Sequence, residues 1–139
     1  MRTPVTVDAS VFVNALSPDE DRSDESAEFI SRLKQDGVVL IEPTLFMTEI
    51  AASIARKQDN SEIALEILHD LRAFPKLTLI DLDEDFAEYA GQVAAGHRLR
   101  GSDAVYAAVA LRFGCELVTL DKEQLERLPR IVAVRSPAK

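Results

Sequence analysis

Short runs of β-branched and aliphatic residues alternate with longer segments of helical periodicity along this chain. Such alternation is typical of parallel βαβ units, in which each strand is followed by a helix that returns the chain to the same sheet. With 139 residues, 47% of them apolar, and no repeat or interior linker, the sequence predicts one α/β domain over residues 1–139. The strands are expected at residues 5–7, 38–41, 77–82, 117–120 and 131–134.

Helix-capping and helix-breaking residues separate these runs. Ser23, Asn60 and Asp83 are each predicted to cap a helix, and Gly37 is predicted to end the first of the three. Ser102 follows a glycine-containing break and is predicted to open another long helix. Further helices are expected at residues 10–16, at 43–57 and after residue 121.

Four carboxylates lie where this pattern places strand ends or sheltered helix edges. Asp8 and Asp121 each follow a strand, at the carboxyl-terminal edge of the sheet where ligands bind in open parallel α/β folds. Asp103 lies in a first helical turn, and Glu49 lies beside the apolar face of a mid-chain helix. Four acids held close together repel one another, so their convergence would predict a hard divalent cation with oxygen ligands.

Each of these acids also has a purely structural interpretation. Asp8 and Asp121 stand where an aspartate is a favoured helix N-cap, and Asp103 stands where the helix dipole favours negative charge. Glu49 at the edge of its apolar stripe is compatible with a solvated side chain. That all four acids have only structural roles is less probable than that any one of them does. One carboxylate can also combine a cap role with a metal role through its two different oxygens.

Composition restricts the classes of function. The net charge of −8 and the pI near 4.7 argue against nucleic-acid binding over a broad surface, but they allow metal-assisted contact with a single phosphate. Two histidines and one cysteine exclude a structural zinc site, and Cys115 in its apolar surroundings is predicted to be a packed thiol. No apolar run approaches the roughly 18 residues of a membrane span, and no signal-peptide core is evident, so a cytoplasmic location is expected.

Four segments resemble the PIN-domain nucleases in order and spacing, and the chain looks most like the VapC-type ribonuclease toxins of toxin–antitoxin modules. The segments are residues 7–14, 43–50, 101–108 and 117–121. The resemblance implies a three-layer α/β/α fold with a five-stranded parallel sheet of strand order 3-2-1-4-5. It also implies hydrolysis of RNA phosphodiester bonds with Mg²⁺ or Mn²⁺, leaving 5′-phosphate and 3′-hydroxyl ends.

The same resemblance assigns roles to individual positions. The residues that match the family's metal-binding acids are Asp8, Glu49, Asp103 and Asp121. The residues that match its polar supporting positions are Ser10, Asn14 and Thr119. The segment 121–125 departs from the family pattern, because it lacks the aromatic residue that the family often has soon after the last acid, Asp121.

Partners are predicted partly from the residues and partly from the resemblance. Arg98 and Arg100 precede Asp103 and are expected to contact the RNA backbone, with a solvated basic turn as the alternative. His97 is expected to be a helix-end residue rather than a catalytic base. The resemblance implies a cognate antitoxin and a homodimer, and residues such as Met47 and Ile63, which lie off the main apolar stripes, indicate either a partner surface or extra core.

Two other functions remain open at this stage. A PIN-like module could bind RNA or a protein partner without cleaving. A phosphoacceptor receiver domain shares the strand alternation, but it needs an acidic pair near the first strand and a lysine after the fifth. Asp8 stands alone, and residues 135–137 supply no lysine, so the receiver function is disfavoured.

Overall fold

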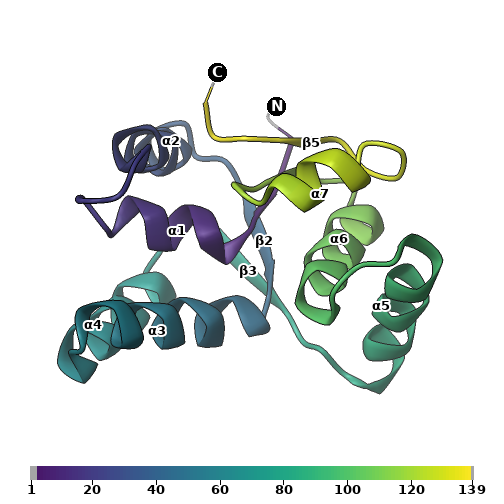
Figure 1. The fold of residues 1–139 in the computed structure, drawn as a ribbon, viewed down its shortest axis with the longest axis horizontal. Helices are drawn as coiled ribbons and strands as arrows, with labels where there is room; N and C mark the ends of the chain where they lie inside the picture. The colour runs from purple at the N-terminus through teal and green to yellow at the C-terminus, as the bar shows by residue number, and fades with distance from the viewer. Residues whose placement is uncertain (1–2, 139) are drawn as a thin grey trace.

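The computed structural model describes residues 3–138 and contains one parallel sheet with the strand order β3-β2-β1-β4-β5 (Figure 1). All four strand pairings are parallel, which confirms the predicted fold class and order. The flavodoxin-like order 2-1-3-4-5 of receiver domains is thereby excluded. The strands are β1 (Val5–Val7), β2 (Leu40–Pro43), β3 (Leu77–Ile80), β4 (Glu116–Val118) and β5 (Val134–Arg135).

Helices cover both sides of the sheet, with α1 to α4 on one side and α5 and α6 on the other (Figure 1). Asp8, Asn60, Asp83 and Asp121 each accept hydrogen bonds from backbone N–H groups in the first turn of the helix that follows. The helices are α1 (Ala9–Ala15), α2 (Ser23–Gln35), α3 (Leu45–Gln58), α4 (Ser61–Arg72), α5 (Glu84–His97), α6 (Gly101–Phe113) and α7 (Lys122–Arg127).

Helix α6 contains the longest uninterrupted buried run of the described helices and packs against β1, β2 and β4. Every residue from 103 to 110 is buried, because most of this segment is alanine and valine and neighbours enclose it on all sides. The start of α6 therefore brings Asp103 into the interior of the molecule, near the carboxyl ends of the central strands.

The carboxyl ends of β1 and β4 lie side by side at the centre of the sheet. The backbone N–H of Asp8 donates to the carbonyl of Val118 over 2.8 Å, so the end of β1 is fixed against the end of β4. From here the chain enters α1 after β1 and α7 after β4. Asp8 and Asp121 thus flank the point at which the strand order reverses, as an open α/β sheet requires for a ligand crevice.

Several local predictions need correction. The second strand lies at residues 40–43 rather than 38–41. Ser23 is not the cap of α2 but its first residue and is buried, and Arg22 precedes the helix in the left-handed conformation (φ 68°). The fifth strand begins at Val134 rather than at residue 131, because the N–H groups of Ile131 and Val132 both donate to the carbonyl of Leu128 and continue the turn after α7. None of the helices in residues 3–138 is both long and apolar enough to cross a membrane.

Candidate functional site

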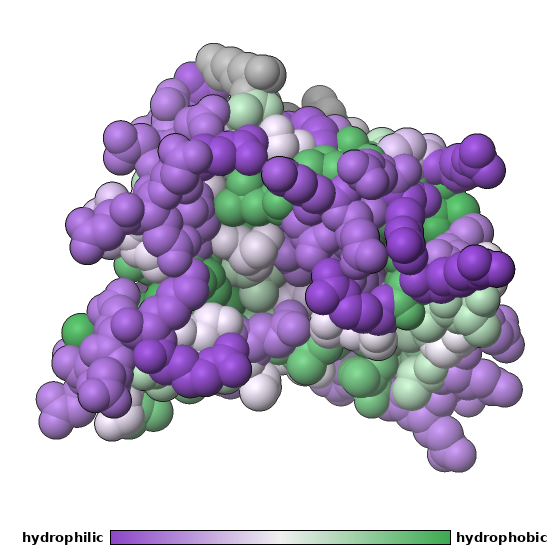
Figure 2. All heavy atoms as spheres, in the orientation of Figure 1, coloured by the Kyte–Doolittle hydropathy of each residue, from purple (hydrophilic) through white to green (hydrophobic). Residues whose placement is uncertain are grey.

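A groove lies where α1 and α3 face the beginnings of α6 and α7, and the surface is hollowed there (Figure 2). It is lined by the four carboxylates singled out in the sequence, together with two of the three supporting residues. These residues are Asp8, Glu49, Asp103, Asp121, Ser10 and Asn14. Thr119 lies beneath the groove and is fully buried. The tertiary structure therefore gathers acids that are up to 113 residues apart in sequence, from Asp8 to Asp121.

Asp8 forms the floor of the groove at the end of β1. Its side chain is buried, and Oδ2 accepts from the Ser10 N–H over 3.4 Å and from the Thr119 hydroxyl over 3.2 Å. Burial raises the pKa of the Asp8 carboxyl, and the nearby charge of Asp103 adds to the rise, while the bonds from Ser10 and Thr119 oppose it. Asp8 is therefore both a helix cap and a member of a repulsive carboxylate cluster.

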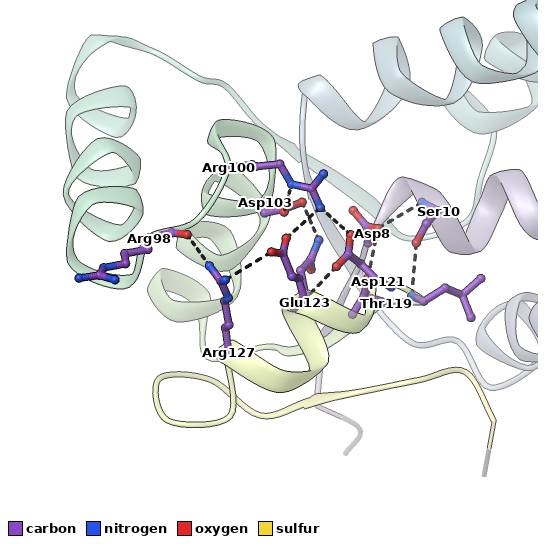
Figure 3. A network of polar contacts seen from close by, with 11 residues as sticks. Asp8, Ser10, Arg98, Arg100, Asp103, Thr119, Asp121, Glu123 and Arg127 are labelled. Carbon is purple, nitrogen blue, oxygen red and sulfur yellow. Dashed lines mark hydrogen bonds and ion pairs between the residues drawn. The ribbon is translucent and has the colours of Figure 1, made fainter.

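The supporting residues connect the two central strand ends (Figure 3). The hydroxyl of Thr119 donates to Asp8 and also accepts from the Asp121 N–H over 3.0 Å. The hydroxyl of Ser10 accepts from the Leu120 N–H over 3.3 Å. These bonds join the start of α1 to the segment between β4 and α7, and they fix the separation of Asp8 and Asp121.

Asn14 supports the far end of the groove rather than the carboxylates. Its side-chain oxygen accepts from the Ser26 hydroxyl over 2.7 Å, and its nitrogen donates to the carbonyl of Asp21 over 3.0 Å. The same nitrogen reaches Glu20, which also forms an ion pair with Lys57. Asn14 thus holds α1 against α2, and Lys57 provides a basic group at this end of the groove.

Glu49 enters the groove from α3, on the side opposite Asp103. It is half-buried, and its Oε1 accepts from the Tyr106 hydroxyl over 2.7 Å. Burial raises the pKa of the Glu49 carboxyl, and the charges of Asp8 and Asp103 add to this effect. Tyr106 lies on α6 and is fully buried, so its hydroxyl orients Glu49 from within the core.

Asp103 lies in the first turn of α6 and uses its two oxygens differently. Oδ1 accepts from the side-chain nitrogen of Gln124 over 2.8 Å, and Oδ2 lies 3.3 Å from Nε of Arg100. Burial raises the pKa of the Asp103 carboxyl and Asp121 adds to the rise, although Gln124 and Arg100 both oppose it. Asp8, Glu49 and Asp103 thus share one electrostatic feature, because burial and a neighbouring carboxylate both disfavour their charged forms.

Arg100 lies over the carboxylates, whereas the side chain of Arg98 points away from them (Figure 3). The guanidinium of Arg100 pairs with Asp103 at 3.3 Å, with Asp121 at 3.1 Å and with Glu123 at 3.2 Å. These charges raise the pKa of Arg100, with Asp103 as the largest contributor. Arg98 is linked to this region through its carbonyl, which accepts from Arg127 over 2.9 Å.

Sequence reasoning missed two buried polar residues beside the site, Gln124 and Glu42. Gln124 was passed over because it stands in a short polar helix where an exposed side chain is the ordinary expectation. Glu42 belongs to β2 and is fully buried, and its Oε2 accepts from the Val7 N–H of β1 over 2.8 Å. Burial raises the pKa of Glu42 well above its ordinary value, and Asp8 adds to the rise. A glutamate directly before Pro43 at the end of an apolar run was the available signal.

The donor set fits a hard divalent cation in its chemistry, because the groove supplies carboxylate oxygens from four separate elements. Within residues 3–138, no three acidic, histidine or cysteine side chains stand close enough together to hold a metal ion without moving. The guanidinium of Arg100 already places a positive charge against Asp103 and Asp121. Metal binding would therefore require Arg100 to turn away and the carboxylates to draw together.

The family model of the PIN domain matches residues 5–131 of the chain. A search of curated protein sequences gives no match. Among solved structures, the VapBC2 complex of Rickettsia felis bound to a promoter DNA fragment aligns with a TM-score of 0.71 and 15% identity, over 95% of this chain and 97% of that one. VapC20 of Mycobacterium tuberculosis, a toxin that cleaves the sarcin-ricin loop, aligns with a TM-score of 0.70 and 17% identity, over 86% and 91%.

The DNA-bound VapBC complex of Salmonella typhimurium shares the fold to a similar extent, with a TM-score of 0.69 and 15% identity over 99% of this chain and 100% of that one. At these identities the structural matches establish the fold. The family model covers nearly all of the chain, and the sheet order agrees with it. This protein therefore belongs to the PIN domain family.

Proposed function

We propose that this protein is a divalent-metal-dependent endoribonuclease that hydrolyses RNA phosphodiester bonds. The observation that supports this most directly is the convergence of Asp8, Glu49, Asp103 and Asp121 on one groove of a PIN domain. Burial and mutual repulsion raise the pKa of Asp8, Glu49 and Asp103, and of these three Arg100 pairs only with Asp103, so a bound divalent cation would relieve the repulsion. Perturbed acids gathered in a cleft are typical of functional sites.

The four acids would hold Mg²⁺ or Mn²⁺, with Asp8 and Asp103 nearest the floor of the groove. When bound, such an ion polarises a phosphate and lowers the pKa of a water molecule to yield a nucleophile. Ser10 and Thr119 would hold the segments that carry Asp8 and Asp121 side by side through the bonds described above, while the two carboxylates move toward the ion. Tyr106 would keep Glu49 turned toward the groove. Asn14 would support the wall of α1.

The RNA backbone would enter beside Arg100, the basic residue closest to the carboxylates. In this proposal Arg100 releases the carboxylates when the cation binds and turns toward a phosphate of the substrate. Arg98 would contact the backbone farther from the acids, because its side chain points outward (Figure 3). The net charge of −8 restricts RNA contact to this groove and its rim.

The protein would act as the toxin of a toxin–antitoxin pair. This part of the proposal rests on the family resemblance and on the shared fold with the R. felis and S. typhimurium complexes. A small antitoxin would cover the acidic groove, and the toxin would form a homodimer. Met47 and Ile63, which the sequence left as either a partner surface or extra core, both pack against the core.

The decisive experiment is an RNA cleavage assay with purified protein, a mixed RNA pool and Mg²⁺ or Mn²⁺. Cleavage is expected to need the metal, to stop with EDTA, and to be lost in the Asp8→Asn and Asp103→Asn variants. Asp85→Asn is the matched control, because it makes the same change at an exposed position in the first turn of α5, outside the groove. Cleavage that persists in EDTA and in both groove variants would overturn the proposal.

Partner binding needs a separate experiment. If a small open reading frame adjoins the gene, co-expression with it is expected to yield a complex that copurifies. Light scattering of the purified protein is expected to give a dimer. A monomer at micromolar concentration with no copurifying partner would contradict this part and leave the ribonuclease proposal standing.

A second candidate is a PIN-like module that binds RNA or protein without cleaving it. The ion pairs of Arg100 favour this alternative, because they place a permanent cation where the metal would bind. Calcium binding distinguishes the two functions without relying on turnover. A protein that binds RNA but shows no Ca²⁺ or Mn²⁺ binding by calorimetry would be the non-catalytic module.

A further inference from the structure

Gln124 contacts two of the four carboxylates at once. It lies in α7 and is only 1% exposed, although most of the residues around it in this short helix are exposed or half-buried. Its backbone N–H donates to Oδ1 of Asp121 over 3.1 Å, and its side-chain Nε2 donates to Oδ1 of Asp103 over 2.8 Å. One residue therefore connects the acid after β4 to the acid at the start of α6.

The side-chain oxygen of Gln124 is in an energetically unfavourable environment. Its Oε1 is buried and has no hydrogen-bond partner within residues 3–138. Buried acceptors are nearly always paired, because an unpaired one has lost its hydration without replacement. Turning the amide over would not help, since Oε1 would then face the carboxylate of Asp103. Asp103 thus fixes the orientation of the amide, and the unpaired oxygen is the consequence.

An apolar side chain of similar size would fill this space without leaving a buried oxygen unpaired. Within residues 3–138, the side chain of Gln124 makes no hydrogen bond other than the one to Asp103, so any benefit of the amide lies in that bond. Gln124 is neutral, and it orients this carboxylate without supplying the positive charge that Arg100 brings to Oδ2. With Oδ1 held from behind, Oδ2 stays directed at the groove.

We propose that Gln124 is a positioning residue that orients the Asp103 carboxylate toward the groove and thereby sets the affinity of the site for a divalent cation. This inference rests on the proposed metal-dependent function. Gln124 lies in the segment after Asp121 that lacks the aromatic residue common in the family. The proposal gives this segment a polar role, the orientation of Asp103. Residues that orient metal ligands in this way commonly change metal affinity about 10-fold to 100-fold when they are replaced.

The test is calorimetric titration of the full chain with Mn²⁺, free of RNA. Gln124→Met keeps the size of the side chain, removes the donor to Asp103 and also removes the unpaired oxygen. We expect it to weaken Mn²⁺ binding about 10-fold or more, while the melting temperature of the metal-free protein stays within a few degrees of wild type. Gln92→Met is the matched control, because Gln92 is exposed on α5 and its replacement should leave Mn²⁺ binding unchanged.

Gln124→Asn is the second variant and decides the matter should Gln124→Met fail to fold. It keeps an amide but is one methylene too short to reach Asp103 from the same helix, so it should weaken Mn²⁺ binding as well. If wild type binds Mn²⁺ and the folded Gln124 variants bind it equally well, Gln124 only fills space and the inference is wrong. If wild type itself binds no Mn²⁺, the metal-dependent function fails and this inference fails with it.

Discussion

Glu42 offers a quantitative test of how the floor of the groove is built. At the carboxyl ends of β1 and β2, two side chains provide hydrogen bonds between the strands. The Thr6 hydroxyl donates to the carbonyl of Ile41 over 2.9 Å, and the Val7 N–H donates to Oε2 of Glu42 over 2.8 Å. Glu42 therefore fixes the strand end that immediately precedes Asp8. Replacing it with methionine, which has similar bulk, should leave the buried N–H of Val7 without a partner.

The expected cost follows from this single bond. Leaving a buried donor unpaired destabilises a protein by about 1–3 kcal/mol. For a chain of this length, 1 kcal/mol corresponds to about 4 °C in melting temperature, so Glu42→Met should melt about 4–12 °C below wild type at pH 5.5. Glu42→Gln should avoid this loss, because an amide oxygen can accept from the Val7 N–H. The amide nitrogen would take the place of Oε1, which already has no hydrogen-bond partner within residues 3–138.

The two variants should also differ in their response to pH. Burial raises the pKa of Glu42 in the folded state, so the folded protein binds this proton more tightly than the unfolded chain does. The stability that Glu42 contributes is therefore complete below its unfolded pKa, near 4.3, and is lost as the pH rises through the higher folded pKa. Glu42→Gln cannot ionise, so its stability relative to wild type should increase from pH 5.5 to pH 8.5.

Thermal melts of wild type, Glu42→Gln and Glu42→Met at pH 5.5 and pH 8.5 measure both effects, with metal removed by EDTA. Glu42→Met as stable as Glu42→Gln would show that β1 and β2 can pair directly, and it would refute the proposed bridging role. A Glu42→Gln variant with the same pH dependence as wild type would refute the reasoning about the buried carboxyl.

Carboxylate repulsion predicts that Asp103→Asn raises the metal-free melting temperature more at pH 7 than at pH 4, because burial and Asp121 raise the pKa of Asp103 in the folded state. Equal shifts at both pH values would contradict this prediction. Arg100→Gln should bind Ca²⁺ about 2-fold to 10-fold more tightly by calorimetry, because no guanidinium competes, whereas Arg127→Gln should not. The double variant Arg98→Ala, Arg100→Ala should bind single-stranded RNA with a weaker salt dependence, measured in Ca²⁺ with a cleavage-inactive protein. The slope of log K against log salt concentration should fall in magnitude by about 0.7 per lost phosphate contact, and an unchanged slope would place the RNA path elsewhere.

Local physical chemistry explains which features the sequence determined by itself. The alternation of strand and helix periodicities led to a parallel α/β sheet, and the structure has the order expected from the family resemblance. Asn60 and Asp83 cap helices as predicted, because a cap needs only the backbone of the next two or three residues. Strand ends in a parallel sheet meet at one edge, so the sequence places Asp8 and Asp121 at that edge, and the strand order implied by the family resemblance makes them neighbours.

Only the tertiary structure decided which groups contact the acids. Arg98 and Arg100 are equivalent in sequence, two residues apart in one basic turn, yet only the guanidinium of Arg100 reaches the carboxylates. Arg98 takes a left-handed conformation at the end of α5 (φ 55°), and α6 begins after Arg100. The geometry of this short connection sets the direction of each side chain, and residue spacing does not reveal it.

The buried polar partners of the acids are the contacts that the sequence reveals least. Tyr106 meets Glu49 across 57 residues, and Thr119 meets Asp8 across 111. Gln124 stands at a position where the sequence indicates nothing unusual, and Glu42 has only its place at the end of an apolar run as a signal. Both side chains are buried because strands and helices from distant segments close over them. Periodicity and capping depend on the nearest few residues, whereas the pairing of a buried donor with its acceptor depends on how the whole chain packs.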